Sequence, residues 1–319
     1  MPLRRLLSPL ALLAAVLSAQ APAAKSYFVL HRLAPGVYAA VDNPGSSAGS
    51  NAGFVIGRRA VAVIDTFQSV PAARALLAAI RSRTRLPIRY VINTHYHIDH
   101  VTGNQVFADA GAVIFAQRNV RYWIHTLNLK FFSHPTPAQR AWVAGLRSPD
   151  VVYTHGVTLY LGGRQLDVRV LPGHTGGDSA ILVPDANVVF TGDLFWGHAL
   201  PNLIDASTAP LLTTLTQLSR WPPRPHAIFV PGHGVIGNRA ALLAFRGYVA
   251  ALRRLVAQAR ARGLRRQALV AAVLPELKAR YGNWGFFSHF ARLNLLETDA
   301  ELAGRKSIPQ PPAAGSTGG

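Results

Sequence analysis

Three histidines and one aspartate stand within six residues of this chain, directly after an apolar segment. Residues 88–93 have the composition of a buried strand, and they run into Thr94-His95-Tyr96-His97-Ile98-Asp99-His100. A loop that leaves the end of a strand can direct several side chains at one point. Neutral imidazole and carboxylate are the usual ligands of zinc and similar metals where thiolate is absent. The chain must therefore fold so that this loop faces a metal site.

Three later segments share one format, in which a strand ends, glycine follows and a potential metal ligand comes next. They are Leu171-Pro172-Gly173-His174, Phe190-Thr191-Gly192-Asp193 and Val230-Pro231-Gly232-His233. Glycine allows the backbone to turn tightly at these points. If the three strands are parallel neighbours, all three ligands lie at the same edge of the core. Each segment alone could be an ordinary turn, but together with the first cluster they favour one shared metal site.

The composition limits which nucleophiles, metal ligands and partners the protein can have. The chain has no cysteine, which excludes a thiolate nucleophile, a thiolate metal ligand and disulfides, and leaves His, Asp and Glu as ligands. It has 33 Lys and Arg against 14 Asp and Glu, a formal net charge of +19. The excess charge could attract an anionic partner or could sit on solvated faces of an arginine-rich protein. We favour the second interpretation, and we expect no nucleic-acid partner.

The N-terminus has the pattern of a secretory signal peptide. Arg4 and Arg5 form a basic start, residues 6–17 are apolar, and Ala19-Gln20-Ala21 supplies small residues for cleavage. An uncleaved membrane anchor is the alternative, but the apolar run is short and contains Pro9. We therefore expect residues 1–24 to be removed. The mature protein is then expected to be soluble, without stable membrane insertion, and to be periplasmic or secreted.

Strand-like segments alternate with helical segments, twice over. The predicted strands are residues 27–33, 37–42, 52–56, 60–65, 88–93 and 112–115, followed by 151–153, 157–161, 165–171, 179–183, 187–191 and 227–230. Helices are predicted at residues 69–83, 103–110 and 210–219, and residues 120–146 mix helix and loop. This order predicts an α/β fold with two β-sheets packed face to face and helices on both outer faces, a four-layer αβ/βα sandwich.

A helical extension follows this sandwich. Residues 238–262 carry Leu242, Phe245, Val249, Leu252 and Val256 at the spacing of an amphipathic helix, with Gly263 as a cap. Further helical segments reach residue 302, with interruptions expected near Pro275 and Gly282. We divide the chain into a catalytic domain at 25–240, helices packed on it at 241–303 and a disordered tail at 304–319.

The motifs together resemble the metallo-β-lactamase superfamily. The pattern His95-x-His97-x-Asp99-His100 is followed by His174, Asp193 and His233, and the flanking words Thr191-Gly192-Asp193 and Pro231-Gly232-His233-Gly234 agree. The similarity covers about residues 27 to 240. It is specific for the fold and the metal site and much less specific for the substrate.

The resemblance implies two metal ions, with zinc favoured and iron or manganese as alternatives. His95, His97 and His174 would hold the first ion, and Asp99, His100 and His233 the second. Asp193 would bridge both ions, and Asp65 would support the loop of residues 95–100. A hydroxide between the ions would attack a substrate carbonyl, with Asp193 and Asp99 as the catalytic carboxylates and Asp99 as a proton shuttle.

A bridging aspartate is typical of the superfamily branches that cleave thioesters, lactones, sulfate esters or phosphoesters. The predicted function is a periplasmic metal-dependent hydrolase of an ester, lactone, thioester or lactam in a small molecule. One alternative is a dedicated β-lactamase, and another is an iron-dependent redox enzyme similar to sulfur dioxygenases. A third is a non-catalytic protein that binds anions through its basic surface. The oligomeric state does not follow from the sequence.

Several side chains are candidates for the substrate pocket. Trp196 and His198 follow Asp193 closely and are expected to line the mouth of the site. Two further aromatic groups could form a lid or reach the site from the C-terminal helices: Trp123, Phe131 and Phe132, and Trp284, Phe286 and Phe287. Ordinary core packing is the alternative for each of them.

Overall fold

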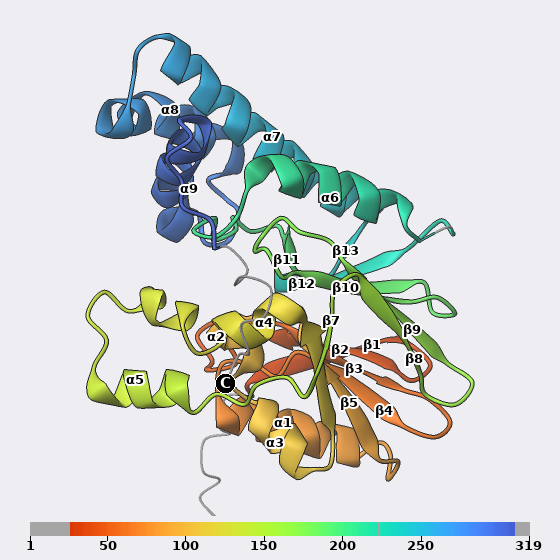
Figure 1. Cartoon of the computed structure of the whole chain (residues 1–319). Helices are drawn as coiled ribbons and strands as arrows, with labels where there is room; N and C mark the ends of the chain where they lie inside the picture. Colours follow the sequence, from red (N-terminus) through yellow and green to blue (C-terminus); the bar gives the residue numbers. More distant parts are fainter. Residues whose placement is uncertain (1–25, 223, 310–319) are drawn as a thin grey trace, which may run out of the picture.

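The computed structural model describes residues 26–222 and 224–309 (Figure 1). Within these ranges the first sheet has seven strands in the order β1-β2-β3-β4-β5-β6-β7. They are β1 (Phe28–Ala34), β2 (Val37–Asp42), β3 (Ala52–Ile56), β4 (Val61–Ile64), β5 (Ile88–Ile92), β6 (Val113–Gln117) and β7 (Val151–Tyr153). Strands β1 to β4 pair antiparallel, whereas β4 to β7 pair parallel. The carboxyl ends of β4 and β5 therefore share one edge of the sheet.

The second sheet has six described strands in the order β13-β12-β11-β10-β9-β8. They are β8 (Gly156–Tyr160), β9 (Gln165–Val170), β10 (Ser179–Val183), β11 (Val188–Gly197), β12 (Ile228–Gly234) and β13 (Gly237–Asn238). Only the β11–β12 pair is parallel among them.

The expected arrangement of three parallel neighbours is therefore wrong in one respect. Strand β10 lies between β9 and β11 and pairs antiparallel with both. Because two reversals restore the direction, β9 still points the same way as β11, and His174 reaches the same edge. Asp193 and His233 also lie inside β11 and β12 and not beyond their ends, since the register shifts at Gly192 allow the ladder to continue past it.

Helices cover the outer faces of both sheets (Figure 1). The helices of the α/β part are α1 (Val70–Arg81), α2 (Ile98–Val101), α3 (Asn104–Asp109), α4 (Arg118–Trp123), the 3-10 helix η1 (Leu127–Phe131), α5 (Pro137–Ala144) and α6 (Thr208–Arg220). Ser69 caps α1, as predicted, by accepting a hydrogen bond from Ala72 N at 3.3 Å.

Apolar side chains of the two sheets meet in one buried layer, which includes Val55, Ile64, Ile92, Ile181 and Phe190. A second apolar layer lies between the first sheet and α1 and α3, and a third lies beneath α6 and α7. The predicted four-layer α/β sandwich is confirmed.

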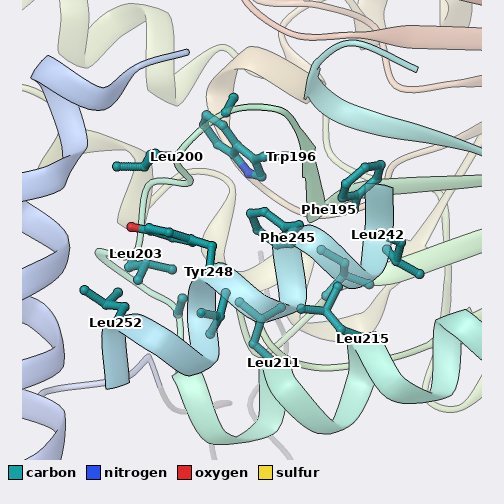
Figure 2. Packing of buried hydrophobic residues seen from close by; sticks show 14 of the residues in the cluster. Phe195, Trp196, Leu200, Leu203, Leu211, Leu215, Leu242, Phe245, Tyr248 and Leu252 are labelled. Atoms are coloured by element: carbon teal, nitrogen blue, oxygen red, sulfur yellow. The ribbon is translucent and has the colours of Figure 1, made fainter. Parts of the chain in front are cut away.

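The C-terminal helices share the core of the second sheet. They are α7 (Arg239–Ala261), α8 (Arg266–Tyr281) and α9 (Phe287–Leu302). Figure 2 shows Phe195 of β11, Leu215 of α6 and Phe245 of α7 in the same buried cluster. The apolar stripe predicted for α7 is buried throughout. The interruption expected at Pro275 is wrong, because α8 continues through this proline.

Six residues of the predicted tail are described, residues 304–309. Lys306 Nζ donates to Leu203 O at 2.5 Å and lies 3.3 Å from Glu297 Oε2. The predicted signal peptide and residues 310–319 lie outside the described residues. In the described ranges, no helix has both the length and the hydropathy needed to cross a bilayer.

Candidate metal centre

Asp65 holds the loop that carries the first four candidate ligands. Thr94 donates to the Asp65 carboxylate twice, from its backbone N at 2.8 Å and from Oγ1 at 2.7 Å. His100 Nδ1 lies 2.8 Å from Asp65 Oδ2. Because this contact occupies Nδ1, the other ring nitrogen of His100 is left to face the cluster. The sequence predicts this supporting position for Asp65.

The first group of ligand atoms comes from four buried side chains, His95, His97, His174 and Asp193, and all four atoms lie within 4.8 Å of one another. His174 Nε2 is 3.1 Å from His97 Nδ1 and 3.2 Å from Asp193 Oδ2. His95 Nε2 is 3.9 Å from the same carboxylate oxygen. Residues from both sheets thus meet at one point.

The second group comprises Asp99, His100 and His233, again within 4.8 Å. His233 Nε2 is 3.2 Å from Asp99 Oδ2 and 3.4 Å from Asp193 Oδ2. His100 Nε2 is 3.2 Å from Asp193 Oδ1. The Asp193 carboxylate therefore contacts both groups, which is the position of a bridging ligand.

These donors fit a pair of divalent cations. Ligand atoms 2.0–2.1 Å from a tetrahedral zinc lie about 3.3 Å from one another. The contacts of His97, His174, Asp99, His100 and His233 are close to this value, and that of His95 with Asp193 is longer at 3.9 Å. His95 Nε2, His100 Nε2 and Asp193 Oδ1 are buried and have no hydrogen-bond partner among the residues that the structure describes. Buried polar atoms without partners are costly, and coordination would satisfy them.

The ionisation of these side chains suits metal binding. Burial and the neighbouring histidines hold the pKa of His95 well below its usual range, and burial lowers the pKa of His174 to about 3. Burial alone would favour a protonated Asp193, but the surrounding histidines outweigh it and hold its pKa well below normal. Burial also opposes protonation of His233, but Asp193 and Asp99 raise its pKa to about 9. His95 and His174 are therefore neutral and Asp193 is ionised, which are the forms that bind metal, whereas a cation at the second group would displace a proton from His233.

Glycine is required beside the ligands because space is short. A Cβ on residue 232 would lie 1.9 Å from Asp193 Oδ1, and one on residue 192 would lie 2.4 Å from Thr94 Oγ1. Gly192 also has a φ of +50°, in the left-handed region. Packing therefore requires glycine at residues 192 and 232, whereas Gly173 lies against Leu211 of α6 and not against the ligand cluster.

Changing Gly232→Ala is therefore expected to displace the Asp193 carboxylate and to reduce bound zinc below one ion per chain after gel filtration. Elemental analysis would measure this loss. Gly247→Ala is the matched control, because nothing lies within 4 Å of that added methyl group in α7. A Gly232→Ala protein with the zinc content of the parent would contradict the prediction.

Asp205 is a functional side chain that sequence reasoning missed. Its Oδ2 accepts a hydrogen bond from Tyr96 OH at 2.5 Å and lies 2.9 Å from His97 Nε2. Lys130 Nζ also donates to this oxygen. Because a carboxylate only accepts, His97 carries its proton on Nε2 and turns the lone pair of Nδ1 toward His174.

The variant Asp205→Asn is expected to weaken zinc binding about 10- to 100-fold, since loss of a carboxylate behind a ligating histidine has effects of that size. Competition with a chromophoric chelator would give the affinity. Asp185→Asn, an exposed aspartate paired with Arg164, serves as the control. Equal zinc affinity in both variants would remove Asp205 from the centre.

A pocket of about 260 Å³ opens above both groups. Its floor contains the ligands His97, Asp99, Asp193 and His233, and its walls are Gly49, Gln68, Ile98, Phe131, Trp196, Asn202, Phe286 and Phe290. Trp196 stacks on His233, with ring centroids 4.0 Å apart. The candidate ligands therefore face a space that a small molecule can enter.

A family model described as the metallo-beta-lactamase superfamily matches residues 48–233. This span is more than half of the chain and contains all seven candidate ligands. The chain belongs to the metallo-β-lactamase superfamily. The family resemblance drawn from the motifs is thereby confirmed.

Curated relatives from this superfamily include hydroxyacylglutathione hydrolases. The protein of Brucella anthropi is 26% identical over 152 residues, 48% of this chain and 50% of the relative. That of Rhodobacter capsulatus is 27% identical over 164 residues, 51% and 54% respectively. The chain thus spans about half the length of the curated relatives it matches. A solved metallo-beta-lactamase from Pontibacter korlensis shares the fold, with a TM-score of 0.57, 20% identity and coverage of 70% of this chain and 99% of that chain.

The metallo-β-lactamase fold brings some predicted pocket residues to the site and leaves others away from it. Trp196, Phe131 and Phe286 line the pocket. His198 does not line it, because the chain turns outward there with a φ of 54°, and its exposed ring lies 5.3 Å from Trp284.

The remaining aromatic candidates pack elsewhere. Trp123 packs on Tyr96, Phe132 packs on Trp142, and Trp284 and Phe287 pack against the core beneath the C-terminal helices. Phe290, Gln68 and Asn202 line the pocket without having been predicted to do so. One helical turn separates Phe286 from Phe290, and this spacing is the signal that could have found Phe290.

Proposed function

We propose that this superfamily member is a metal-dependent hydrolase that cleaves an ester, lactone, thioester or lactam bond in a small molecule. It would use two divalent cations, of which zinc is the first candidate; iron and manganese suit the same donors. The observation that carries this proposal is the convergence of seven donor side chains, four of which lie at the floor of an open pocket, with Asp193 between the two groups.

Two bound cations would lower the pKa of a water molecule and polarise the substrate carbonyl. The protein's own side chains would hold the cations and transfer a proton. Asp193 is almost fully buried, with 3% of its side chain exposed, whereas Asp99 has 22% exposed and faces the pocket. Asp99 is therefore the carboxylate that could take a proton from the attacking water at Oδ2 and return it to the leaving group.

The relatives support different members of this substrate list. The curated hydroxyacylglutathione hydrolases, by their name, favour a thioester, and the solved metallo-beta-lactamase favours a lactam. A dedicated β-lactamase is thus one alternative, and an iron-dependent redox enzyme on the same fold is another. Visible absorption and oxygen uptake by the purified protein would separate the redox enzyme from a colourless zinc hydrolase.

We also propose that the protein is exported to the periplasm or secreted, on the basis of the signal-like pattern in residues 1–24. N-terminal sequencing of protein recovered from the periplasmic fraction tests this. A mature chain that begins near residue 25 is expected, and an intact Met1 on cytoplasmic protein would overturn it.

The hydrolase proposal is tested with purified mature protein loaded with zinc. We expect about two metal ions per chain, consistent with two ligand groups, and turnover of at least one class in a panel of carboxylic esters, lactones, thioesters and β-lactams. Sulfate esters and phosphoesters complete the panel, and we expect no turnover of either. Turnover of none of the carbonyl compounds by fully loaded protein would overturn the proposal.

A further inference from the structure

Four aromatic rings line two sides of the pocket above its floor. Phe131 packs edge-on against His97 at 4.9 Å, beside the first ligand group. On the other side Trp196 stacks on His233, and Phe286 and Phe290 meet Trp196 edge-on at 5.6 and 5.8 Å. Both candidate cation positions are thus flanked by rings, and we call these four residues the aromatic wall.

The pocket offers no counter-charge to an anionic substrate beyond the candidate cations. Among its described lining residues there is no Lys or Arg, and the polar ones that are not ligands are the neutral amides Gln68 and Asn202. The nearby Lys130 is bound to Asp205 and to Tyr96 OH. Lys130 Nζ lies 5.6 Å from the centroid of the Phe131 ring, and its charge is paired with the Asp205 carboxylate. A carboxylate placed against the aromatic wall would lose water and gain no partner, which is costly.

Phe286 is held in the wall at a conformational cost. Its φ of 59° lies in the left-handed region, which is unfavourable for a bulky side chain, and yet 42% of the residue is exposed. The turn before it is tied to the segment after β11, because Gly285 N donates to His198 O and Leu200 N donates to Gly285 O, both at 2.9 Å. An exposed apolar ring on an anchored, strained turn is expected where it contacts a ligand.

Two of the four wall residues lie outside the segment that the family model matches. Phe286 and Phe290 come from the turn before α9 and from α9 itself, whereas the match ends at residue 233. The C-terminal helical region therefore supplies two of the four pocket rings from outside the matched segment.

We propose that the aromatic wall binds an uncharged apolar group, about the size of one aromatic ring, attached to the carbonyl that the enzyme cleaves. This inference rests on the proposed hydrolase function. A cavity of about 150 Å³ holds benzene, so a pocket of about 260 Å³ accommodates a ring together with the reacting carbonyl. In the reaction, water adds to the carbonyl carbon, the bond to the leaving group breaks, and that group takes a proton. The products are an arylalkanoic acid and an alcohol or thiol.

The test compares p-nitrophenyl esters that share one leaving group and differ in the acyl group: phenylacetyl, acetyl and succinyl. Zinc-loaded protein is expected to prefer the phenylacetyl ester over the succinyl ester by about tenfold or more in kcat/KM. The phenyl ring is uncharged and can be buried against the aromatic wall, whereas the free carboxylate of the succinyl group would lose its water without gaining a partner. Phe286→Ala should reduce the preference for phenylacetyl over acetyl severalfold. Phe286→Arg should shift the preference toward succinyl.

Tyr160→Ala is the matched control, an exposed aromatic on β8 far from the pocket lining, and it should leave all ratios unchanged. Binding of the uncleaved analogue phenylacetamide, followed by calorimetry, gives a readout that does not depend on turnover. The parent should bind it more tightly than Phe286→Ala does. Absence of turnover for these esters and for every other carbonyl compound of the panel, with intact phenylacetamide binding, would overturn the hydrolase proposal alone. Hydrolysis with equal or better use of the succinyl ester would overturn the aromatic-wall inference alone.

Discussion

Replacing Asp193 with alanine is expected to lower kcat/KM on the best ester of the panel by on the order of 10³-fold or more. The carboxylate lies 3.2 Å from His174 Nε2 in one ligand group and 3.2 Å from His100 Nε2 in the other. Its loss removes a donor from both cation positions and a balancing negative charge from among the histidines. Metal-ion catalysis contributes several kcal/mol of transition-state stabilisation, and about 4 kcal/mol corresponds to a factor near 10³. Steady-state kinetics and metal analysis of the same preparation would measure both losses.

The Asp193→Ala result needs a control for general damage to the fold. Asp109→Ala removes an exposed aspartate at the end of α3 and should keep parental kinetics and metal content. Near-ultraviolet circular dichroism should show native packing in both variants. An Asp193→Ala protein that keeps two metal ions and full turnover would refute the bridging role.

Removal of metal is expected to abolish hydrolysis and to lower the melting temperature of the protein. An ion that binds only the folded state stabilises it by mass action, by about 4 kcal/mol when its free concentration is a thousand times its Kd. Stripped protein should also leave Asp193 Oδ1, His95 Nε2 and His100 Nε2 buried without partners. Activity and a thermal scan, recorded before stripping, after stripping and after addition of zinc, would measure both effects.

Calcium provides the matching control for metal removal. It prefers oxygen ligands, whereas this centre is built mainly of imidazole nitrogens, so calcium should restore neither activity nor melting temperature. Stripped protein that hydrolyses the ester at the parental rate would exclude a metal-dependent mechanism.

The sequence predicts most of the fold and the gathering of the ligands because both depend on short-range patterns. The strand before His95 is marked by its apolar run, and each of the three later ligands is marked by the glycine that precedes it. Helix α1 is marked by a capping serine and by Pro71 in its first turn. In each case the local segment carries its own signal, which tertiary packing then reinforces.

The residues that the sequence does not predict are those defined by tertiary contacts alone. Asp205 lies 108 positions from His97 along the chain, and nothing near it in sequence marks it as the partner of that imidazole. Trp196 and His198 stand two residues apart, and only the turn after β11 decides that one faces the pocket and the other faces solvent. Pro275 lies within α8 although it cannot donate a backbone hydrogen bond, and nothing in the local sequence indicates that the helix continues through it.

The division of the ligands between the two sheets sets the order in which the centre can be completed during synthesis. The first sheet supplies His95, His97, Asp99 and His100, and the second supplies His174, Asp193 and His233. A nascent chain that ends near residue 170 has only two donors for each ion, too few for tight capture. The first group would be complete once Asp193 has been synthesised, and the second only once His233 has followed, so the two cation positions would become able to select a metal one after the other.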